Sequence, residues 1–198
     1  MPIIQRYASA AGLILLLAGA WQCKGPANPS ANPDANPEAN SDAKASAAIY
    51  RNGATYQNKT GAWEKFRLPD STEVLLNDKS LLSISGGFNK SDRELQLDGE
   101  AVFEVNADAG KPFVVRTRNL QILVLGTRFR VDAHAESPGE EVDLLTGRLK
   151  VIKSYHSTTD NEPEVLQAGE MVMINRDIDL MEKEKMSPAE LDKVKAMK

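Results

Sequence analysis

The sequence has few of the residue types that carry out most enzymatic and metal chemistry. Its 198 residues include one cysteine and two histidines, and aromatic residues make up only 6%. A single cysteine cannot close a disulfide within the chain, and with only His134 and His156 beside it the usual zinc shell is not available. No glycine-rich phosphate loop of the GxGxxG or Walker type occurs. We therefore expect no metal and no cofactor.

The chain also lacks a strong excess of charge of either sign. It carries 24 basic and 28 acidic side chains, which gives a net charge of -4. Nucleic-acid binding usually requires a basic excess over a whole face, so we expect no nucleic-acid partner. The length suits one globular domain with appendages.

The N-terminus carries an export signal. The apolar run from Ala8 to Trp21 is too short for a bilayer span, which needs about 20 residues, but it fits a secretory signal peptide. We predict a signal peptide over residues 1–22 and lipidation at Cys23, although Gln22 is large for a strict lipobox. A cut after Ala20 and an uncleaved anchor are the alternatives. The predicted location is periplasmic or associated with the outer membrane, through a lipid anchor.

Residues 23–48 form a Pro/Asn/Ala-rich linker. The tetrads ANPS, ANPD and ANPE follow one another, and a serine- and alanine-rich tract comes after them. Proline at every fourth position blocks helix and sheet ladders, and the few apolar groups do not offset the entropy of ordering. The linker is therefore predicted to be a tether for the domain that follows.

Residues 49–180 are predicted to form an all-β domain, because short β-prone segments alternate with turn residues. In the longest segment one face carries Leu95, Leu97, Ala101, Phe103 and Val105, and the other carries Glu94, Gln96, Asp98, Glu100 and Glu104. This alternation predicts a strand with one side in water. The pattern alone fits a sandwich, a barrel or a solenoid.

Residues 181–198 are predicted to form a C-terminal helix and tail, with Ser187, Pro188 and Glu190 completing a capping box.

Two groups of charged residues are candidates for function. Glu100 and Glu104 lie on one strand face, and most glycosidases require a pair of carboxylates for catalysis. Because that face is predicted to be solvated, we expect no catalytic residues and no enzyme. The cations occupy alternate positions in neighbouring segments: Arg116, Arg118, Arg128 and Arg130. They either line one face that attracts an anionic partner or pair with carboxylates across strands, and we favour pairing. These six residues are the candidate partner-binding face.

Six motifs occur in the order and spacing of the FecR domain. They are LPDSTEVLLN (68–77), LDGEAVFEV (97–105), KPFVVRT (111–117), VLGTRFRV (124–131), VDLLTGRLKV (142–151) and LQAGE (166–170). The chain therefore resembles the FecR family over about 100 residues. Ser71 stands where the first family motif usually has glycine, which affects the geometry expected for that turn.

The resemblance implies a periplasmic β domain of solenoid type in a bacterial envelope regulator. It favours a short β-solenoid or β-roll-like fold, with a β-sandwich as the alternative. Only about seven residues precede the apolar run, so the cytoplasmic segment of the family is missing and no direct sigma-factor binding is expected. The predicted function is a non-catalytic lipoprotein that binds an envelope protein partner, senses a signal or forms a scaffold. The alternatives are a structural envelope protein that binds anionic polymers and a carbohydrate-active β-solenoid enzyme.

Overall fold

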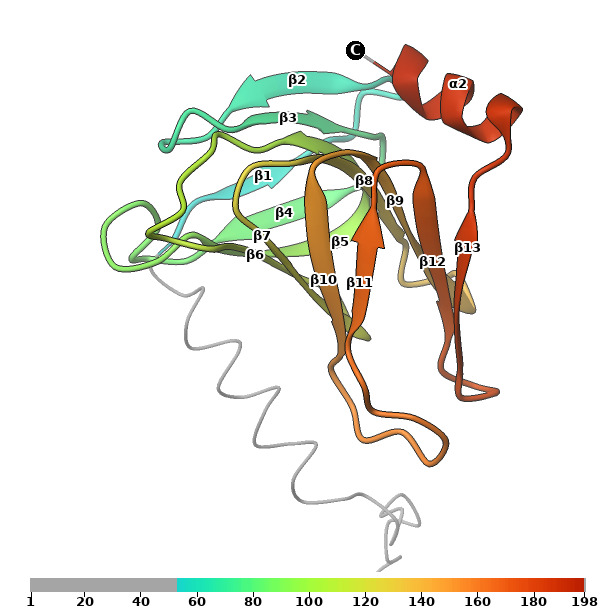
Figure 1. Ribbon diagram of the computed structural model, residues 1–198. Coiled ribbons are helices and arrows are strands. Elements are labelled where there is room, and N and C mark those ends of the chain that lie inside the picture. The colour runs from blue at the N-terminus through green and yellow to red at the C-terminus, as the bar shows by residue number, and fades with distance from the viewer. Residues whose placement is uncertain (1–52, 198) are drawn as a thin grey trace, which may run out of the picture. The chain divides into compact units, whose positions relative to one another are not determined.

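The computed structural model describes residues 53–197 (Figure 1). The predicted signal peptide, Cys23 and the linker lie outside these residues. The strands are β1 (Thr55–Gln57), β2 (Glu64–Arg67), β3 (Glu73–Leu76), β4 (Leu81–Ile84), β5 (Glu94–Glu104), β6 (Phe113–Arg116), β7 (Leu120–Val124), β8 (Arg128–Ala133), β9 (Gly139–Thr146), β10 (Arg148–Lys153), β11 (Glu164–Gln167), β12 (Glu170–Asn175) and β13 (Leu180–Lys185), and helix α2 spans Pro188–Ala196.

The long strand β5 belongs to two sheets. Its first half pairs with β4 and β6, and its second half pairs with β3 and β8. The change of partners falls at Gly99, which has a φ of +115°. A Cβ at this position would lie 2.3 Å from the Oγ of Ser80, so only glycine allows this approach.

The two sheets form one nearly closed, barrel-like structure (Figure 1). Sheet A has the order β1-β4-β5-β6-β7-β10-β11, and sheet B has the order β2-β3-β5-β8-β9-β12-β13. The predicted all-β class is confirmed. The arrangement differs from the expected solenoid or roll, which would stack parallel strands, because β5 and β6 form the one parallel pair among the described strands.

The core lies between the inner faces of the two sheets. Phe103 packs against Phe129 with ring centroids 5.2 Å apart and against Phe113 with centroids 6.0 Å apart. The apolar side chains that the alternation places on one face are all buried: Leu95, Leu97, Ala101, Phe103 and Val105. Phe113, Phe129 and Val131 of the neighbouring strands are buried beside them. The period-two pattern therefore identified the core face of β5 correctly.

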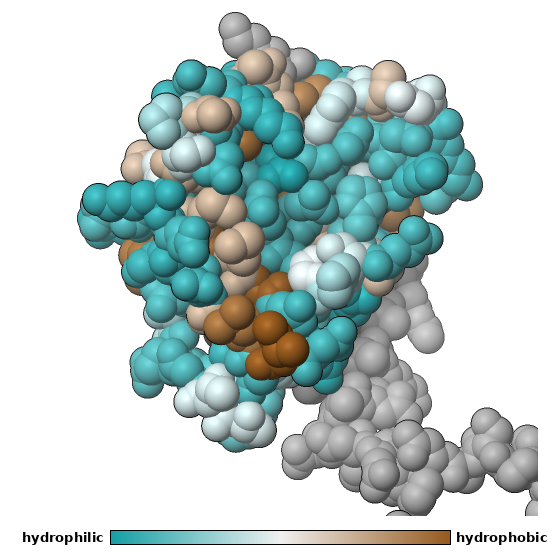
Figure 2. Space-filling model, turned by 90° about the vertical axis from the view of Figure 1, so that its right-hand side faces the viewer, coloured by the Kyte–Doolittle hydropathy of each residue, from teal (hydrophilic) through white to brown (hydrophobic). Residues whose placement is uncertain are grey.

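The far edges of the two sheets are bridged by polar contacts. Lys183 of β13 forms an ion pair of 2.8 Å with Glu164 of β11. The β12–β13 turn also contacts the β10–β11 loop, since the backbone N–H and the hydroxyl of Thr158 both donate to Asp179 at 2.7 Å. Figure 2 shows this side as mostly hydrophilic with one group of apolar side chains. The exposed apolar residues of β11, β12, β13 and the β12–β13 turn are Val165, Met173, Ile178 and Leu180.

Helix α2 begins at the predicted cap. The Ser187 hydroxyl accepts a hydrogen bond from the N–H of Glu190, and the Glu190 carboxylate accepts one of 2.7 Å from the N–H of Ser187. Val194 is buried, and Arg128 of β8 donates to the carbonyl of Met197 at 2.7 Å. The helix is therefore held on the outer face of sheet B. The sequence places the end of the β domain at residue 180, whereas β13 extends it to Lys185 by pairing with β12.

The turn between β2 and β3 contains Ser71, the serine that replaces the usual glycine of the first motif. The N–H of Ser71 donates to the carbonyl of Leu68 at 2.9 Å, and Ser71 has a φ of +69°. Glycine is the residue that adopts this left-handed conformation at low cost, and it commonly fills this position of a three-residue hairpin loop.

Replacing Ser71 with glycine should therefore raise the free energy of unfolding by about 0.5 to 1 kcal/mol. Urea unfolding of the two proteins measures the difference. Ser83→Gly is the matched control: Ser83 lies within β4, where glycine should lower stability by a similar amount. A Ser71→Gly protein that is less stable than the parent would contradict the strain at this turn.

Candidate functional site

The structure divides the six residues of the candidate partner-binding face between the two sheets. Arg116 lies on sheet A and pairs with Glu94 at 3.4 Å. Arg118 lies in the β6–β7 loop and donates to the carbonyls of Ala135 and Ser137. The other four share the outer face of sheet B: Glu100, Glu104, Arg128 and Arg130. The four arginines therefore do not form one continuous cationic face, because β6 and β8 belong to different sheets.

Strand register places the four residues of sheet B beside one another. Glu104 lies directly opposite Arg128, and Glu100 lies opposite Asp132, two residues along the strand from Arg130. Residues opposite each other in an antiparallel pair have neighbouring side chains on one face. The alternative in which cations pair with carboxylates across strands is therefore the arrangement found in this sheet.

Arg130 lies at the centre of a group of four carboxylates, here called the Arg130 cluster. Its Nη1 is 2.6 Å from both Glu141 and Asp143, its Nη2 is 3.1 Å from Asp132, and its Nε donates to Glu100. Arg130 is 8% exposed and Glu100 is 7% exposed. The expectation that Glu100 is solvated is therefore wrong, although its outward direction was predicted correctly. Asn77 and Arg130 both hydrogen-bond the Glu100 carboxylate, which satisfies its charge away from water.

The Arg130 cluster shifts the pKa of two of its members. Burial, aided by the nearby charge of Glu141, raises the pKa of Asp143 to about 6 despite the hydrogen bond from Arg130. Burial also disfavours the charged form of Arg130, but hydrogen bonds and charges from Glu100 and Asp143 outweigh it and raise the pKa of Arg130. The guanidinium is therefore always charged, and the carboxylates exceed it in number.

We predict that the stability of the protein falls as the pH rises from about 4 to about 6. In this window folded Asp143 keeps a proton that the unfolded chain has released, so the folded state binds more protons and loses stability with increasing pH. Asp143→Asn should reduce the loss of stability between pH 4.5 and pH 7.5 by about 2 kcal/mol, and the part that remains comes from Glu140, whose pKa is also raised by burial. Urea unfolding at the two pH values measures the effect.

The control for this prediction is Glu162→Gln, which changes an exposed carboxylate in the β10–β11 loop. It should leave the pH dependence of the parent protein intact. If Asp143→Asn and the parent protein showed the same change in stability between the two pH values, burial of Asp143 would not be the cause.

Helix α2 covers part of the Arg130 cluster. A small cavity of about 70 Å³ lies between the helix and the sheet, and it is lined by Arg130, Glu141, Asp143, Met171, Glu190, Lys193 and Val194. Lys193 contributes a cation from the helix to a region in which carboxylates are in excess. The helix therefore limits the access of water to the cluster and contributes to the burial of Asp143.

A second buried ion pair was not found by sequence reasoning. Arg93 is 1% exposed, and its Nη1 lies 3.3 Å from the Oδ2 of Asp70. Its guanidinium also donates to the carbonyls of Asn106, Asp108 and Lys111. Arg93 therefore ties the β2–β3 turn and the β5–β6 loop to the start of β5. The one signal in the sequence is that Asp70 belongs to the LPDS motif, whose distant partner the motif itself does not reveal.

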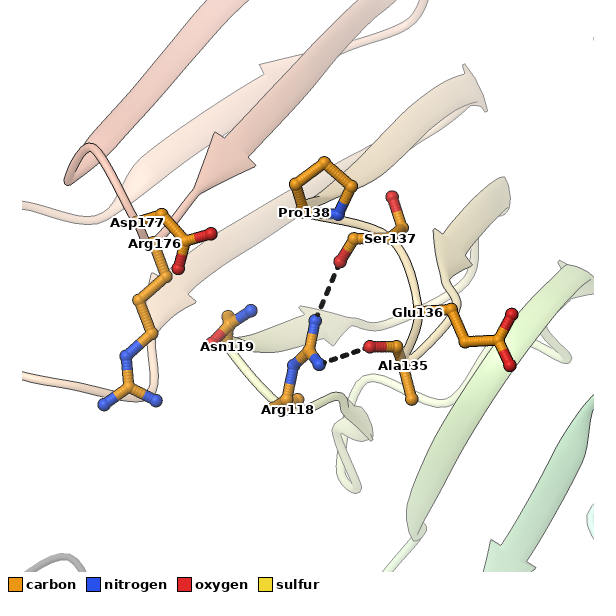
Figure 3. Close-up of a pocket in the computed structure, with 8 residues that line it drawn as sticks. All are labelled: Arg118, Asn119, Ala135, Glu136, Ser137, Pro138, Arg176 and Asp177. Carbon is orange, nitrogen blue, oxygen red and sulfur yellow. Dashed lines mark hydrogen bonds between the residues drawn. The ribbon is translucent and has the colours of Figure 1, made fainter.

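Loops at one end of the barrel-like structure enclose an open cleft of about 600 Å³ (Figure 3). Its lining residues come from the β6–β7, β8–β9 and β12–β13 loops: Arg118, Asn119, Ala135, Glu136, Ser137, Pro138, Arg176 and Asp177. Glu140, which contacts the lining residue Asn119, is 3% exposed and accepts hydrogen bonds from Thr117 and Asn119. Burial raises the pKa of Glu140. Of the six predicted face residues, only Arg118 lines this cleft.

Two further properties concern the described part of the chain only. Within residues 53–197, no three histidine, cysteine, aspartate or glutamate side chains are grouped as a metal site would need. The helix in this range is also too short and too polar to cross a membrane.

Comparison with known proteins identifies the family of the domain at residues 54–150. Residues 54–150 match the family model described as FecR protein, so this part of the chain is a FecR domain and the resemblance seen in the sequence is confirmed. A comparison with curated proteins finds no match. The FecR family and its anti-sigma-factor-like neighbours are regulatory and non-enzymatic.

Two crystal structures from Parabacteroides distasonis ATCC 8503 are similar to the chain. Both are described as a "putative anti-sigma factor", and both share 29% sequence identity with it. The TM-scores are 0.62 and 0.61, and the matches cover 68% of this chain. The chain spans 61% and 60% of the length of those structures.

Proposed function

We propose that this protein is a non-catalytic FecR-domain lipoprotein of the bacterial envelope that senses a signal or forms a scaffold by binding a protein partner. The observation that carries the proposal is the FecR domain at residues 54–150, in a fold similar to structures described as anti-sigma factors at 29% identity. Regulators of this kind act through protein contacts, so a protein partner is the natural ligand.

The outer face of sheet B beside α2 is the proposed contact surface. Glu104 is exposed on this face and Arg128 is half-buried, whereas Arg130 and Glu100 are buried and bound to one another. Because the Arg130 cluster neutralises its own cation, this face offers little attraction to an anionic polymer. This charge balance favours a protein partner over a polymer.

Crosslinking in intact cells tests the proposed surface. A photo-crosslinking residue in place of Glu104 should capture a reproducible envelope protein. The same residue in place of Lys150, which is exposed on sheet A, is the matched control and should not capture it. Failure to find a reproducible partner at either position would count against partner binding, and equal capture at both would count against the face.

The lipid anchor is proposed from the position of Cys23 after the signal-like run. Mass spectrometry of the mature N-terminus should find an acylated Cys23, and Cys23→Ala should release the protein from the membrane fraction. A mature chain that begins at Trp21 with an unmodified cysteine would refute the anchor without touching the evidence for the FecR domain.

A further inference from the structure

One side chain in the cleft has an unmet hydrogen-bonding need. Asn119 is 2% exposed, and its Oδ1 has no hydrogen-bond partner among the described residues. Its Nδ2 donates to the Oε1 of Glu140 at 3.0 Å, and the Glu140 carboxylate fixes this orientation because a reversed amide would place oxygen against oxygen. A buried acceptor without a donor costs about 1 to 3 kcal/mol. The cleft therefore has a place for a donor such as an amide N–H.

The two walls beside Asn119 carry opposite charges. In Figure 3, Asn119 lies between Arg118 on one side and Asp177 on the other. Arg118 is held by hydrogen bonds to Ala135 (2.7 Å) and Ser137 (3.1 Å), which use two of the five N–H donors of its guanidinium. The remaining donors can bind a carboxylate without the cost of fixing the side chain. Asp177 offers an acceptor for an ammonium group.

The other lining residues favour a dipolar ligand over a simple anion. Arg176 and Glu136 complete the charged lining, so its two cations and two anions cancel. The guanidinium of Arg176 lies 5.1 Å from the ring centroid of Tyr155, and Glu136 points away from the cleft in Figure 3. With no net charge, the cleft has no long-range attraction for phosphate or sulfate. A volume of about 600 Å³ falls within the range of small-ligand sites.

We propose that this cleft binds a short zwitterionic peptide. The terminal carboxylate binds Arg118, a backbone amide N–H donates to Asn119 Oδ1, and the terminal ammonium binds Asp177. A dipeptide carries these three groups in this order along one small molecule, whereas acetate, phosphate and simple amines each lack at least two of them. This site is distinct from the outer face of sheet B, and the inference does not rest on a protein partner.

Isothermal titration of the full chain with alanyl-alanine tests the site. We expect saturable binding with one site per chain. N-acetyl-alanyl-alanine lacks the ammonium group and alanyl-alanine amide lacks the carboxylate, and each should bind about threefold to tenfold more weakly because one charged contact is lost. Acetate at the same concentration should not compete.

Two variants test which residue binds each end of the peptide. Asp177→Asn should weaken alanyl-alanine but leave the acetylated analogue unchanged, since that analogue makes no contact with Asp177. Arg118→Gln should weaken alanyl-alanine but leave the amide analogue unchanged. Arg148→Gln, an exposed change at the start of β10, is the control and should alter nothing. Because each variant is compared between two ligands, a general loss of folding cannot produce this pattern.

Three results would overturn the proposal. The first is the absence of saturable binding of alanyl-alanine. The second is equal affinity for the dipeptide and its two analogues. The third is weakening by Arg148→Gln as large as that by Asp177→Asn. None of these results bears on the FecR domain or on crosslinking at Glu104, so the failure of one proposal leaves the other standing.

Discussion

Replacing Arg93 with methionine should lower the free energy of unfolding by about 3 to 5 kcal/mol. Arg93 is 1% exposed, and its removal leaves the Asp70 carboxylate buried without its cation. The carbonyls of Asn106 and Lys111 also lose charge-assisted hydrogen bonds. Methionine fills much of the volume of the arginine side chain, so the loss of stability reflects the missing polar contacts more than a cavity. Urea unfolding followed by circular dichroism measures it.

Arg67 provides the matched control, because its ion pair with Glu73 lies on the surface. Arg67→Met should cost less than about 1 kcal/mol. Arg93→Lys keeps the charge but loses the planar fork that reaches several acceptors, so its stability should lie between those of the parent and Arg93→Met. Similar stabilities for the two methionine variants would mean that the buried contacts of Arg93 contribute little. If Arg93→Met does not fold, Arg93→Lys still provides the comparison.

Replacing Arg130 with methionine should also destabilise the protein, by about 3 kcal/mol at pH 7.5, and the loss should shrink in acid. Without Arg130, the carboxylates of Glu100, Asp143 and Glu141 face one another with no cation between them. Their mutual repulsion disappears when they are protonated. Unfolding measured at pH 7.5 and at pH 4.5 should therefore show a larger difference between parent and variant at the higher pH.

A combined variant separates charge from packing at the Arg130 cluster. Adding Glu100→Gln and Asp143→Asn to Arg130→Met removes two of the unpaired charges and should recover most of the lost stability at pH 7.5. No recovery would show that the loss comes from packing around the guanidinium. A penalty equal at both pH values would lead to the same conclusion.

Local patterning predicted much of the fold. The sequence predicts strands at 73–76, 113–117, 120–125 and 148–152, and these agree with β3, β6, β7 and β10 to within one residue at each end, because alternation and turn residues are local signals. The capping box of α2 was equally visible, since its two hydrogen bonds join residues three apart. The arrangement of the sheets was not visible, because pairing partners depend on the whole chain.

Three features could not be predicted from local pattern. The strand β13 has the sequence LMEKEK, in which charged residues predominate, and it forms because β12 offers an unpaired edge. Glu100 lies on the outer face as expected, but it is buried because Arg130 and Asn77 bind its carboxylate. Arg93 is buried because it binds acceptors that lie 13 to 23 residues away in sequence. Each outcome depends on tertiary contacts.

Only part of the candidate site could be predicted from the sequence, because the rest also depends on tertiary contacts. Alternation placed Glu100 and Glu104 on one face of β5, and Arg128 and Arg130 on one face of β8, and register brings these two faces together. Arg116 and Arg118 fit the same alternation but belong to the β6–β7 hairpin, which pairs with the other half of β5. The cleft draws on three loops that are distant in sequence, so its composition could not be predicted.

The sharing of β5 by both sheets has a consequence for how the domain folds. Sheet A contains β1, β4, β6, β7, β10 and β11, while sheet B contains β2, β3, β8, β9, β12 and β13, so the two sets of strands interleave along the chain. Neither half of the chain therefore holds a complete sheet, and five of the twelve pairings among the described strands join strands that are not consecutive in sequence: β1–β4, β3–β5, β5–β8, β7–β10 and β9–β12. We expect slow folding and a single cooperative unfolding transition. A protease that cuts one inter-strand loop should thus weaken both walls of the domain at once.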